Sequence, residues 1–522
     1  MPTASRTTAF GLLLAVFIVS RLILNVFTPL MDPSESRYAV FAKNMTQSGN
    51  WWQPTYNYEG VETVFVGKPP LAFQMSMACC KALGISEFAT RLPAFFSALL
   101  ILWLVWHFVK KWRDAQSAAY AVLLTCCSFL FYMYAGQTMT DLILTAAIVG
   151  AIFSYAGFER ELAISNEQLA NDACASPTPH YTVYSLLFFV FIALGVLVKG
   201  PVAIVMSGLP VFFYVLINNR WKNLKYHAWV LGTIAFLAIV VPYYWIVSVK
   251  HPDFLQYFII EENFNRFLFK GSASRFGTAR ESFYGVSFLW FLALNAPAVF
   301  LIQLYPSQNR KKMYAGNMFK DPLTGISALT CITLTLFWAL TSRVLITYLL
   351  PTIPFFAVFL AVRFRDSGLL DQPGFSKKLN IFLTSWIILL PILFAGVVYS
   401  AIYNTAELAS PVVACAVKEI EKNPDFAQRG YYFAGLSPHY AEYYYKDKTL
   451  FHVPESIEDS LKNSENDWLF ITHRQQKRYG KPIDRKLVFQ KGQWSVYAPS
   501  ETNVPETPAD DVVIPSTVLP NN

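Results

Sequence analysis

The stretch AFGLLLAVFIVSRLILNVFTPL, residues 9–30, decides the fold together with MDPSESRYA, residues 31–39, which follows it directly. A transmembrane helix needs about 20 mainly apolar residues, and residues 9–30 meet that length with Arg21 as their one charge. Because no A-x-A type cleavage site is present, the run predicts an anchored first helix rather than a signal peptide. Arg21 would either snorkel to the interface or pair inside a helix bundle.

Further apolar runs predict a polytopic α-helical membrane protein. The composition agrees, because 54% of the residues are hydrophobic and only 15% are charged, whereas soluble domains carry about a quarter charged residues. The stretch 69–84 is amphipathic and too interrupted to count as a span. The predicted spans are 9–30, 91–109, 115–134, 139–157, 182–198, 202–218, 228–248, 283–304, 323–341, 344–362 and 379–402.

Basic residues beside these runs predict the orientation. They favour every second loop, with two exceptions: the outer stretch 250–282 is also basic, and the inner loop 158–180 carries only Arg160. By the positive-inside rule the N-terminus lies in the cytoplasm and the C-terminal part outside. This pattern explains the net charge of +8 by membrane topology rather than by a nucleic-acid partner. The inner clusters are Lys110, Lys111 and Arg113; Arg220, Lys222 and Lys225; Arg310, Lys311, Lys312 and Lys320; and Arg363, Arg365, Lys377 and Lys378.

The predicted domain organisation has three parts. Residues 1–402 form the membrane domain, with outer loops at 31–90 and 249–282. Residues 403–498 read as a small extracytoplasmic α/β domain, since a helical pattern over Val412–Lys422 precedes strand-like runs at Asp467–Ile471 and Gln493–Tyr497. Residues 499–522, rich in Pro, Thr, Asp and Asn, predict a disordered tail.

Acidic residues stand where the chain leaves the first predicted span. Asp32, Pro33 and Glu35 fit a helix start, because aspartate caps, proline suits the first turn and glutamate favours the positive end of the helix dipole. The same two carboxylates are candidates for chemistry, since a helix that begins at the membrane surface aims its side chains into the mouth of the bundle.

Three more charged residues are predicted on the same side of the membrane. Asp141 begins the fourth span, where an acid is costly unless it faces a cavity or a partner. Lys68 precedes two prolines that stiffen the backbone, so it either binds a phosphate headgroup or snorkels. Lys199, before Gly200 and Pro201, lies at another outer boundary. The loop 249–282 adds basic residues interleaved with aromatic ones, which fits anionic lipid heads or a merely interfacial segment.

The order of several short motifs resembles the bacterial aminoarabinose transferase and dolichyl-phosphate-mannose-protein mannosyltransferase (PMT) group. The resemblance covers about residues 10–365. The segments that carry it are 32–39 (DPSESRYA), 68–70 (KPP), 87–93 (EFATRLP), 140–141 (TD), 199–201 (KGP), 263–267 (NFNRF) and 348–351 (YLLP).

The resemblance implies a GT-C glycosyltransferase fold with outer-face loop helices, in the bacterial inner membrane. It implies transfer of a hexosyl or pentosyl group from a polyprenyl (undecaprenyl) phosphate donor to lipid A, another glycan or a protein. It assigns catalysis to Asp32, Glu35 and Asp141, with Asp32 and Glu35 as alternatives because Ser34 replaces the family's aspartate. The residues implied to bind the lipid phosphate or sugar are Arg37, Tyr38, Lys68, Lys199 and Arg266.

A metal is not carried over with the resemblance. In aminoarabinose transferases a glutamate often precedes the Lys-Pro-Pro motif and helps to hold a metal, but Gly67 stands there in this chain, and residues 270–282 contain no histidine. No Walker or Rossmann glycine pattern is present either, and a lipid-phosphate donor needs no nucleotide.

Three alternatives remain at this point. An O-antigen ligase or polymerase also uses undecaprenyl-linked sugars, but it relies on arginines and histidines of a large outer loop. A lipid-linked sugar transporter or flippase would place ionisable groups near the bilayer midplane and show inverted repeats. A non-catalytic assembly factor would use its C-terminal domain to bind a partner.

Overall fold

The computed structural model places most of the chain in two compact units. The first comprises Met1–Leu22, Val66–Ala72 and Leu92–Pro391, and the second comprises Ile23–Phe65, Phe73–Arg91 and Ile392–Asn522. The residues that the structure describes are 3–31, 34–58, 61–171, 180–269, 282–303, 318–404, 417, 420, 429–434, 443, 449–452, 458, 461–462, 465–480, 485–491 and 494–499.

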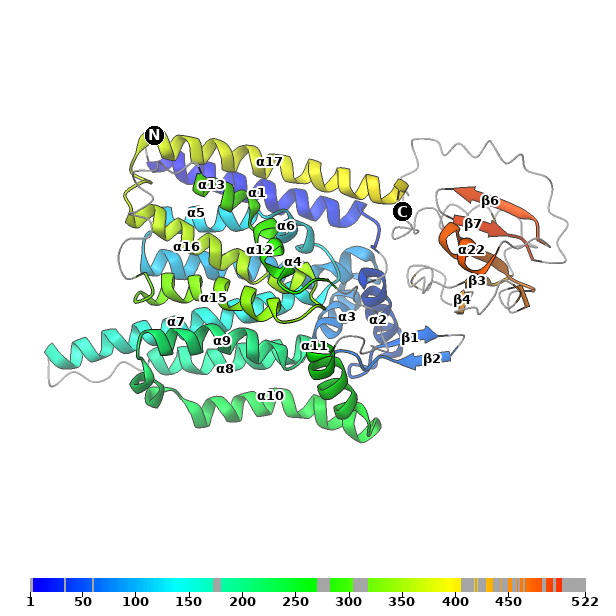
Figure 1. Cartoon of the computed structure of the whole chain (residues 1–522), viewed down its shortest axis with the longest axis horizontal. Helices are drawn as coiled ribbons and strands as arrows, with labels where there is room; N and C mark the ends of the chain where they lie inside the picture. The colour runs from blue at the N-terminus through cyan, green and yellow to red at the C-terminus, as the bar shows by residue number, and fades with distance from the viewer. Residues whose placement is uncertain are drawn as a thin grey trace. The chain divides into compact units, whose positions relative to one another are not determined.

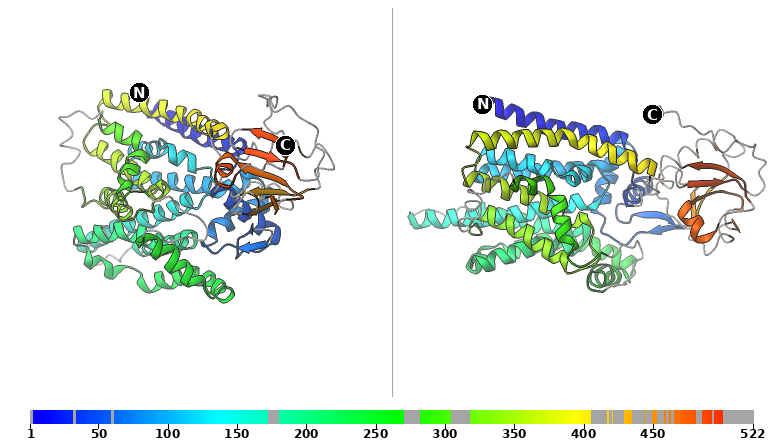
Figure 2. Two further views of the ribbon diagram at one scale, coloured as in Figure 1. Left: turned by 45° about the vertical axis from the view of Figure 1, so that its right-hand side comes forward. Right: turned by 45° about the horizontal axis from the view of Figure 1, so that its top comes forward.

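The first unit is a bundle whose long helices run side by side, as Figures 1 and 2 show. Its elements include α1 (Thr3–Phe27), α4 (Glu87–Trp112), α5 (Ala115–Cys126), α6 (Phe129–Tyr134), α7 (Thr140–Asn171), α8 (His180–Lys199), α9 (Val202–Ile217), η1 (Trp221–Tyr226), α10 (Trp229–Lys250), η2 (Gln256–Asn265), α11 (Arg266–Leu268), α12 (Val286–Leu294), α13 (Ala296–Gln303), α15 (Pro322–Ala339), η3 (Ile346–Leu349), α16 (Thr352–Asp366) and α17 (Pro373–Asn404). Helix α7 packs on α8, α8 on α10, and α15 on both α9 and α16.

Among the described residues, eight helices are long and apolar enough to cross a membrane, so the chain is a multi-pass membrane protein. Three of the predicted spans fall short of that length. Residues 115–134 divide into α5 and α6 at Ser128, whose side chain accepts a hydrogen bond from the Phe131 N–H and starts a new helix. Residues 283–304 divide into α12 and α13 at Asn295, and 202–218 become the 16-residue α9.

Arg21 lies inside the bundle, which decides between the two alternatives for this residue. Its side chain is fully buried, and its Nη2 donates to the Met133 carbonyl oxygen at 3.0 Å. The guanidinium also lies 5.6 Å from the centroid of the Tyr132 ring. Helix α6 ends at Tyr134, and the Met133 carbonyl also accepts the Gly136 N–H at 3.4 Å.

The second unit contains the outer loop helices and a small α/β domain. Its elements are α2 (Ser34–Ser48), α3 (Leu71–Leu83), the antiparallel hairpin β1 (Thr55–Tyr58) and β2 (Val61–Val64), and a five-stranded sheet in the order β4-β3-β5-β7-β6. The sheet comprises β3 (Tyr431–Ala434), β4 (Thr449–His452), β5 (Trp468–Thr472), β6 (Leu487–Lys491) and β7 (Trp494–Tyr497), with α22 (His473–Tyr479) after β5.

Strands β4, β3 and β5 are parallel to one another, whereas β7 pairs antiparallel with both β5 and β6. Buried aromatic side chains, including Phe433, Trp468 and Trp494, form the core of this sheet. The predicted α/β domain is thereby confirmed, and its strand-like runs correspond to β5 and β7. Most of the predicted helix at Val412–Lys422, and the tail 500–522, lie outside the described residues. The predicted domain boundaries stay predictions.

Candidate functional site

A sharp turn between α8 and α9 places Lys199 at the site. Lys199 ends α8, where a cation suits the negative end of the helix dipole. Gly200 follows at φ +87°, a conformation that favours glycine, and Pro201 starts the next turn. A Cβ built on Gly200 would lie 2.6 Å from Cζ of Phe258, so the turn also has no room for a side chain.

Asp141 is the partner of this lysine. It lies in the first turn of α7, with its side chain 5% exposed, and its Oδ1 accepts a hydrogen bond from Lys199 Nζ at 2.7 Å. The same ammonium lies 4.2 Å from the centroid of the Tyr348 ring. The acid predicted to be costly at this depth therefore has its cation within contact distance.

Lys68 supplies a second ammonium to the same place. Its side chain is partly buried between Gly67 and Pro69. Removal from water, together with the nearby positive charge of Lys199, lowers the pKa of Lys68 to about 8, while the Asp141 carboxylate acts in the opposite direction. Lys68 is therefore mostly protonated at neutral pH and titrates just above it.

Two further charges come from the segment after α10, where η2 is a π-helix. Glu262 and Arg266 pair across one turn, with Oε2 and Nη1 2.9 Å apart. The Tyr257 hydroxyl donates to the other oxygen of Glu262 at 2.9 Å. Widened π-helical turns often occur at functional sites, since they redirect side chains that a regular helix would point elsewhere.

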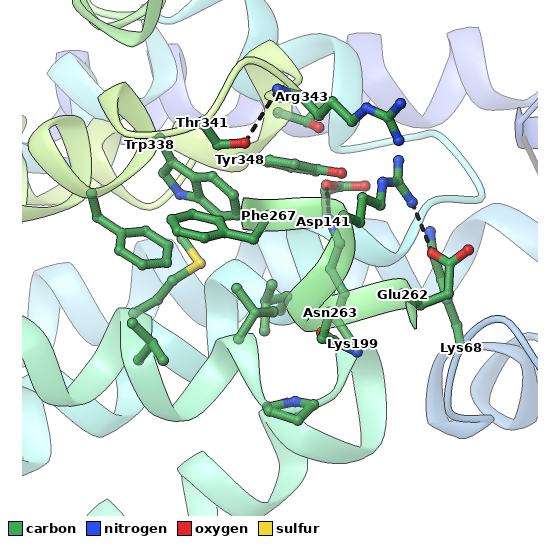
Figure 3. Close-up of a pocket in the computed structure, with 18 of the residues that line it drawn as sticks. Lys68, Asp141, Lys199, Glu262, Asn263, Phe267, Trp338, Thr341, Arg343 and Tyr348 are labelled. Carbon is green, nitrogen blue, oxygen red and sulfur yellow. Dashed lines mark hydrogen bonds and ion pairs between the residues drawn. The ribbon is translucent and has the colours of Figure 1, made fainter. Parts of the chain in front are cut away.

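The charged side chains described above line one cavity of about 360 Å³ in the first unit. Figure 3 shows the charged side chains Asp141, Glu262 and Arg343 on one side of it and the rings of Phe267 and Trp338 on the other. Six charged residues line the cavity: the cations Lys68, Lys199, Arg266 and Arg343, and the acids Asp141 and Glu262. Four positive and two negative charges leave a formal charge of +2.

The rest of the lining is apolar, and part of it also faces outward. Val205, Phe264 and Leu268 line the cavity, yet they are 39%, 56% and 59% exposed. The rings of Phe267 and Phe337 stack beside them at a centroid distance of 4.8 Å. The cavity therefore joins a positively charged end to an apolar wall that reaches the outer surface of the bundle.

The remaining predicted site residues belong to the second unit. Glu35 is buried; its Oε1 accepts from Arg91 Nε at 2.8 Å and its Oε2 from the Met31 N–H at 2.9 Å. Arg91 also donates to the carbonyls of Asn25, Thr28 and Pro29, so this ion pair joins the ends of α1, α2 and α4.

Of the other two residues in α2, Tyr38 packs its ring on Phe41 and Phe73, and Arg37 is partly buried. Asp32 lies outside the described residues.

Several lining residues were not predicted from the sequence. Arg343 lies between two apolar helices, where a single basic residue resembles an ordinary interfacial anchor. Glu262 lies in the predicted outer loop 249–282, for which no acidic residue was given a role, and Tyr348 belongs to the YLLP segment that carried the resemblance. The place of the YLLP segment in the order of motifs was the one sequence signal that pointed to Tyr348.

The donor set of the described lining does not fit a divalent metal. Gly67 offers no side chain beside Lys68, and the two lining carboxylates are already paired with Lys199 and Arg266. No step of the mechanism is therefore assigned to a metal.

Comparison with known proteins finds similar sequences and a similar fold. Residues 7–258 match the family model of dolichyl-phosphate-mannose-protein mannosyltransferase. The undecaprenyl phosphate-alpha-4-amino-4-deoxy-L-arabinose arabinosyl transferase 1 of Proteus mirabilis is 28% identical over 267 residues, which are 50% of this chain and 45% of that protein. The corresponding transferase of Enterobacter sp. is 25% identical over 341 residues, 64% of this chain and 55% of that protein.

Solved structures extend the likeness along the chain. ArnT from Cupriavidus metallidurans bound to undecaprenyl phosphate superposes with a TM-score of 0.71 at 16% identity, covering 95% of this chain and 98% of that one. Residues 7–258 thus resemble a protein mannosyltransferase, and nearly the whole chain has the fold of ArnT.

The Archaeoglobus fulgidus oligosaccharyltransferase is more distant, with a TM-score of 0.52 at 12% identity over 91% of this chain and 70% of that one. These neighbours confirm the predicted GT-C fold. The chain spans about half the length of the curated relatives it matches, 45% and 55% for the two named.

Proposed function

We propose that this chain is a member of the aminoarabinose transferase and protein mannosyltransferase family. It would transfer a sugar from a polyprenyl-phosphate donor, undecaprenyl phosphate in a bacterium, to a glycolipid, glycan or protein acceptor outside the cytoplasm. The observation that carries the proposal is the cavity with a formal charge of +2 at one end and an apolar wall open to the bundle surface. The charged end suits the phosphate, and the apolar wall suits the isoprenoid chain entering from the bilayer.

The sign of the charge also suits catalysis. A polyprenyl phosphate sugar is a monoanionic diester, whereas the polyprenyl phosphate that leaves carries up to two negative charges. A cluster of +2 therefore complements the departing phosphate better than the bound donor, and an interaction that strengthens toward the transition state raises the rate. Lys68, Lys199, Arg266 and Arg343 supply these charges.

The reaction we propose is a direct displacement. The acceptor hydroxyl oxygen bonds to the anomeric carbon, the bond from that carbon to the phosphate oxygen breaks, and the bonding pair leaves on the phosphate. The hydroxyl proton passes to a carboxylate, Asp32 or Glu35, while Asp141, held by Lys199, orients the sugar or the acceptor. The Arg91 pair of Glu35 supports an additional role in shaping the outer loop.

The position of the charged groups favours an enzyme over a transporter. Asp141 lies in the first turn of α7 and Lys199 at the last residue of α8, so both lie at helix ends rather than near the middle of a span. A ligase acting on diphosphate-linked donors is the second candidate among enzymes.

The orientation and location are part of the same proposal. Basic residues at the opposite ends of the helices, including Lys111 and Arg113, support a cytoplasmic N-terminus and an extracytoplasmic C-terminal domain in the bacterial inner membrane. A cysteine at the exposed Lys477 (Lys477→Cys) should react with an impermeant reagent added outside intact spheroplasts. Labelling only after lysis would show that the C-terminal domain lies in the cytoplasm, the opposite of the proposed orientation.

A transfer assay tests the function. The full chain in nanodiscs is mixed with labelled undecaprenyl phosphate sugars and acceptor-containing membranes, and Asp141→Asn and Lys68→Ala are compared with Lys222→Ala, a matched exposed lysine at the other end of the bundle. We expect full transfer by wild type and Lys222→Ala, and much slower transfer by the other two. Equal transfer by all variants would show that the proposed site is wrong. Transfer only from a diphosphate-linked donor would favour the ligase.

A further inference from the structure

A patch of large apolar side chains is exposed on the outer loop helices of the second unit. Trp51 and Trp52 are 40% and 39% exposed, and Leu83 and Ile85, at the end of α3 and beyond it, are 60% and 40% exposed. None of these residues belongs to the cavity lining or to the helices long enough to span a membrane. We refer to the four side chains as the Trp51 patch.

The backbone and side chains hold the two indoles in place. The Asn50 side-chain oxygen accepts hydrogen bonds from the N–H groups of Trp52 and Gln53, at 2.9 Å and 3.3 Å, which fixes the turn that presents both rings. Gln74 Nε2, from α3, donates to the Trp51 carbonyl at 2.7 Å.

A cation from α3 completes the patch. Lys81 Nζ lies 4.9 Å from the centroid of the Trp51 ring, within the range of a cation–π interaction. Phe73, Met77 and Cys80 pack α3 into the protein, whereas Lys81 and Leu83 in its last turn are exposed.

The chain path keeps this patch near the bilayer. The segment joins two candidate spans, Thr8–Phe27 and Glu87–Trp112, and Ile85 precedes the second span by two residues. Trp next to Lys is the side-chain combination enriched at membrane–water interfaces, where the indole lies at headgroup level and the ammonium contacts lipid phosphate.

We propose that the Trp51 patch is a membrane anchor that inserts into the headgroup region of the leaflet on which residues 31–90 emerge, with Lys81 contacting a lipid phosphate. The anchor would set the depth of α2 and α3 at the membrane surface. It follows from the membrane spans and the patch alone, so it stands or falls independently of the transferase proposal.

Fluorine NMR of the full chain in nanodiscs tests this inference. All tryptophans are replaced by 5-fluorotryptophan, and the resonances of Trp51 and Trp52 are identified by their loss in Trp51→Phe and Trp52→Phe. The line broadening of these fluorine resonances is then measured with two paramagnetic reagents. One is a lipid that carries a nitroxide near its headgroup, and the other is a water-soluble chelate. Trp103, 55% exposed within α4, and Trp494, 3% exposed in the sheet, serve as lipid-exposed and buried controls.

We expect the shallow lipid nitroxide to abolish the Trp51 and Trp52 resonances while leaving Trp494 intact. Loss of the two resonances to the water-soluble chelate alone would overturn the proposal, because the rings would then lie in bulk water. Protection from both reagents would equally overturn it, since a second copy or another part of the protein would then cover the patch.

Discussion

The titration of Lys68 offers the most detailed test of the site. Its pKa of about 8 means that the ammonium is protonated at pH 7 and loses its charge as the pH rises through 8. Only the charged form attracts the donor phosphate. Because kcat/KM reports ionisation of the free enzyme, kcat/KM for the donor should be level below about pH 7 and fall roughly tenfold per pH unit above about pH 8.

Three substitutions check that this fall belongs to Lys68. Lys68→Arg should lower the plateau but abolish the fall up to pH 10, since a guanidinium stays charged there. Lys199→Gln removes a positive neighbour and should move the fall to higher pH, whereas Asp141→Asn removes a negative neighbour and should move it to lower pH. The readout is the position of the fall, not the height of the plateau, because all three residues line the cavity.

The assay is donor-dependent transfer by protein in nanodiscs at subsaturating donor, measured from pH 6 to 10 with a reversibility check at each end. A wild-type profile that stays level to pH 10 would refute the assignment of the titrating charge to Lys68. The same fall in Lys68→Arg would place the titrating group elsewhere.

Three other substitutions follow from the geometry. Glu35→Gln leaves Arg91 buried without its counter-ion, so thermal denaturation should show a loss of about 3–5 kcal/mol in the free energy of unfolding; an unchanged melting temperature would contradict the importance of the pair. Gly200→Ala places a Cβ against Phe258 and should therefore reduce transfer. Adding Phe258→Leu should restore part of the activity. Full activity of Gly200→Ala alone would show that the glycine turn is not needed. Arg343→Ala should raise KM for the donor about 10–100-fold, because a charge-assisted hydrogen bond of about 1.5–3 kcal/mol is lost. Arg343→Lys should restore part of the donor affinity. An unchanged KM in Arg343→Ala would exclude contact between Arg343 and the phosphate.

Hydropathy predicted where helices lie but not how they end. The span predicted at 139–157 is the apolar part of α7, which continues to Asn171 because Glu159 and Glu161 find partners. Glu159 accepts hydrogen bonds from Tyr155 and Asn223, and Glu161 pairs with Lys111. A hydropathy scale, which scores the transfer of each side chain from water to lipid, ends the predicted span at such charged residues, although the helix itself continues.

The charged residues of the site were predicted only where local sequence made them unusual. Asp141 opens an apolar run and Lys68 precedes two prolines, so both stood out, and the structure brings them together with Lys199 and Arg266. Arg343 did not stand out, because one basic residue between spans is ordinary. Glu35 was correctly predicted in the first turn of a helix, but its partner Arg91 is 56 residues away in sequence, a distance at which no local pattern indicates a contact.

The central claim, that the cavity holds a lipid phosphate, is tested most directly by binding. Native mass spectrometry of the full chain should measure affinities for undecaprenyl phosphate and for undecaprenol, in wild type, Lys68→Ala and Arg266→Ala, with Lys222→Ala as the control. The structure predicts that undecaprenyl phosphate binds much more tightly than the uncharged alcohol, and that either cavity substitution removes most of this difference while the control keeps it. Equal binding of alcohol and phosphate, unchanged by the cavity substitutions, would contradict the claim.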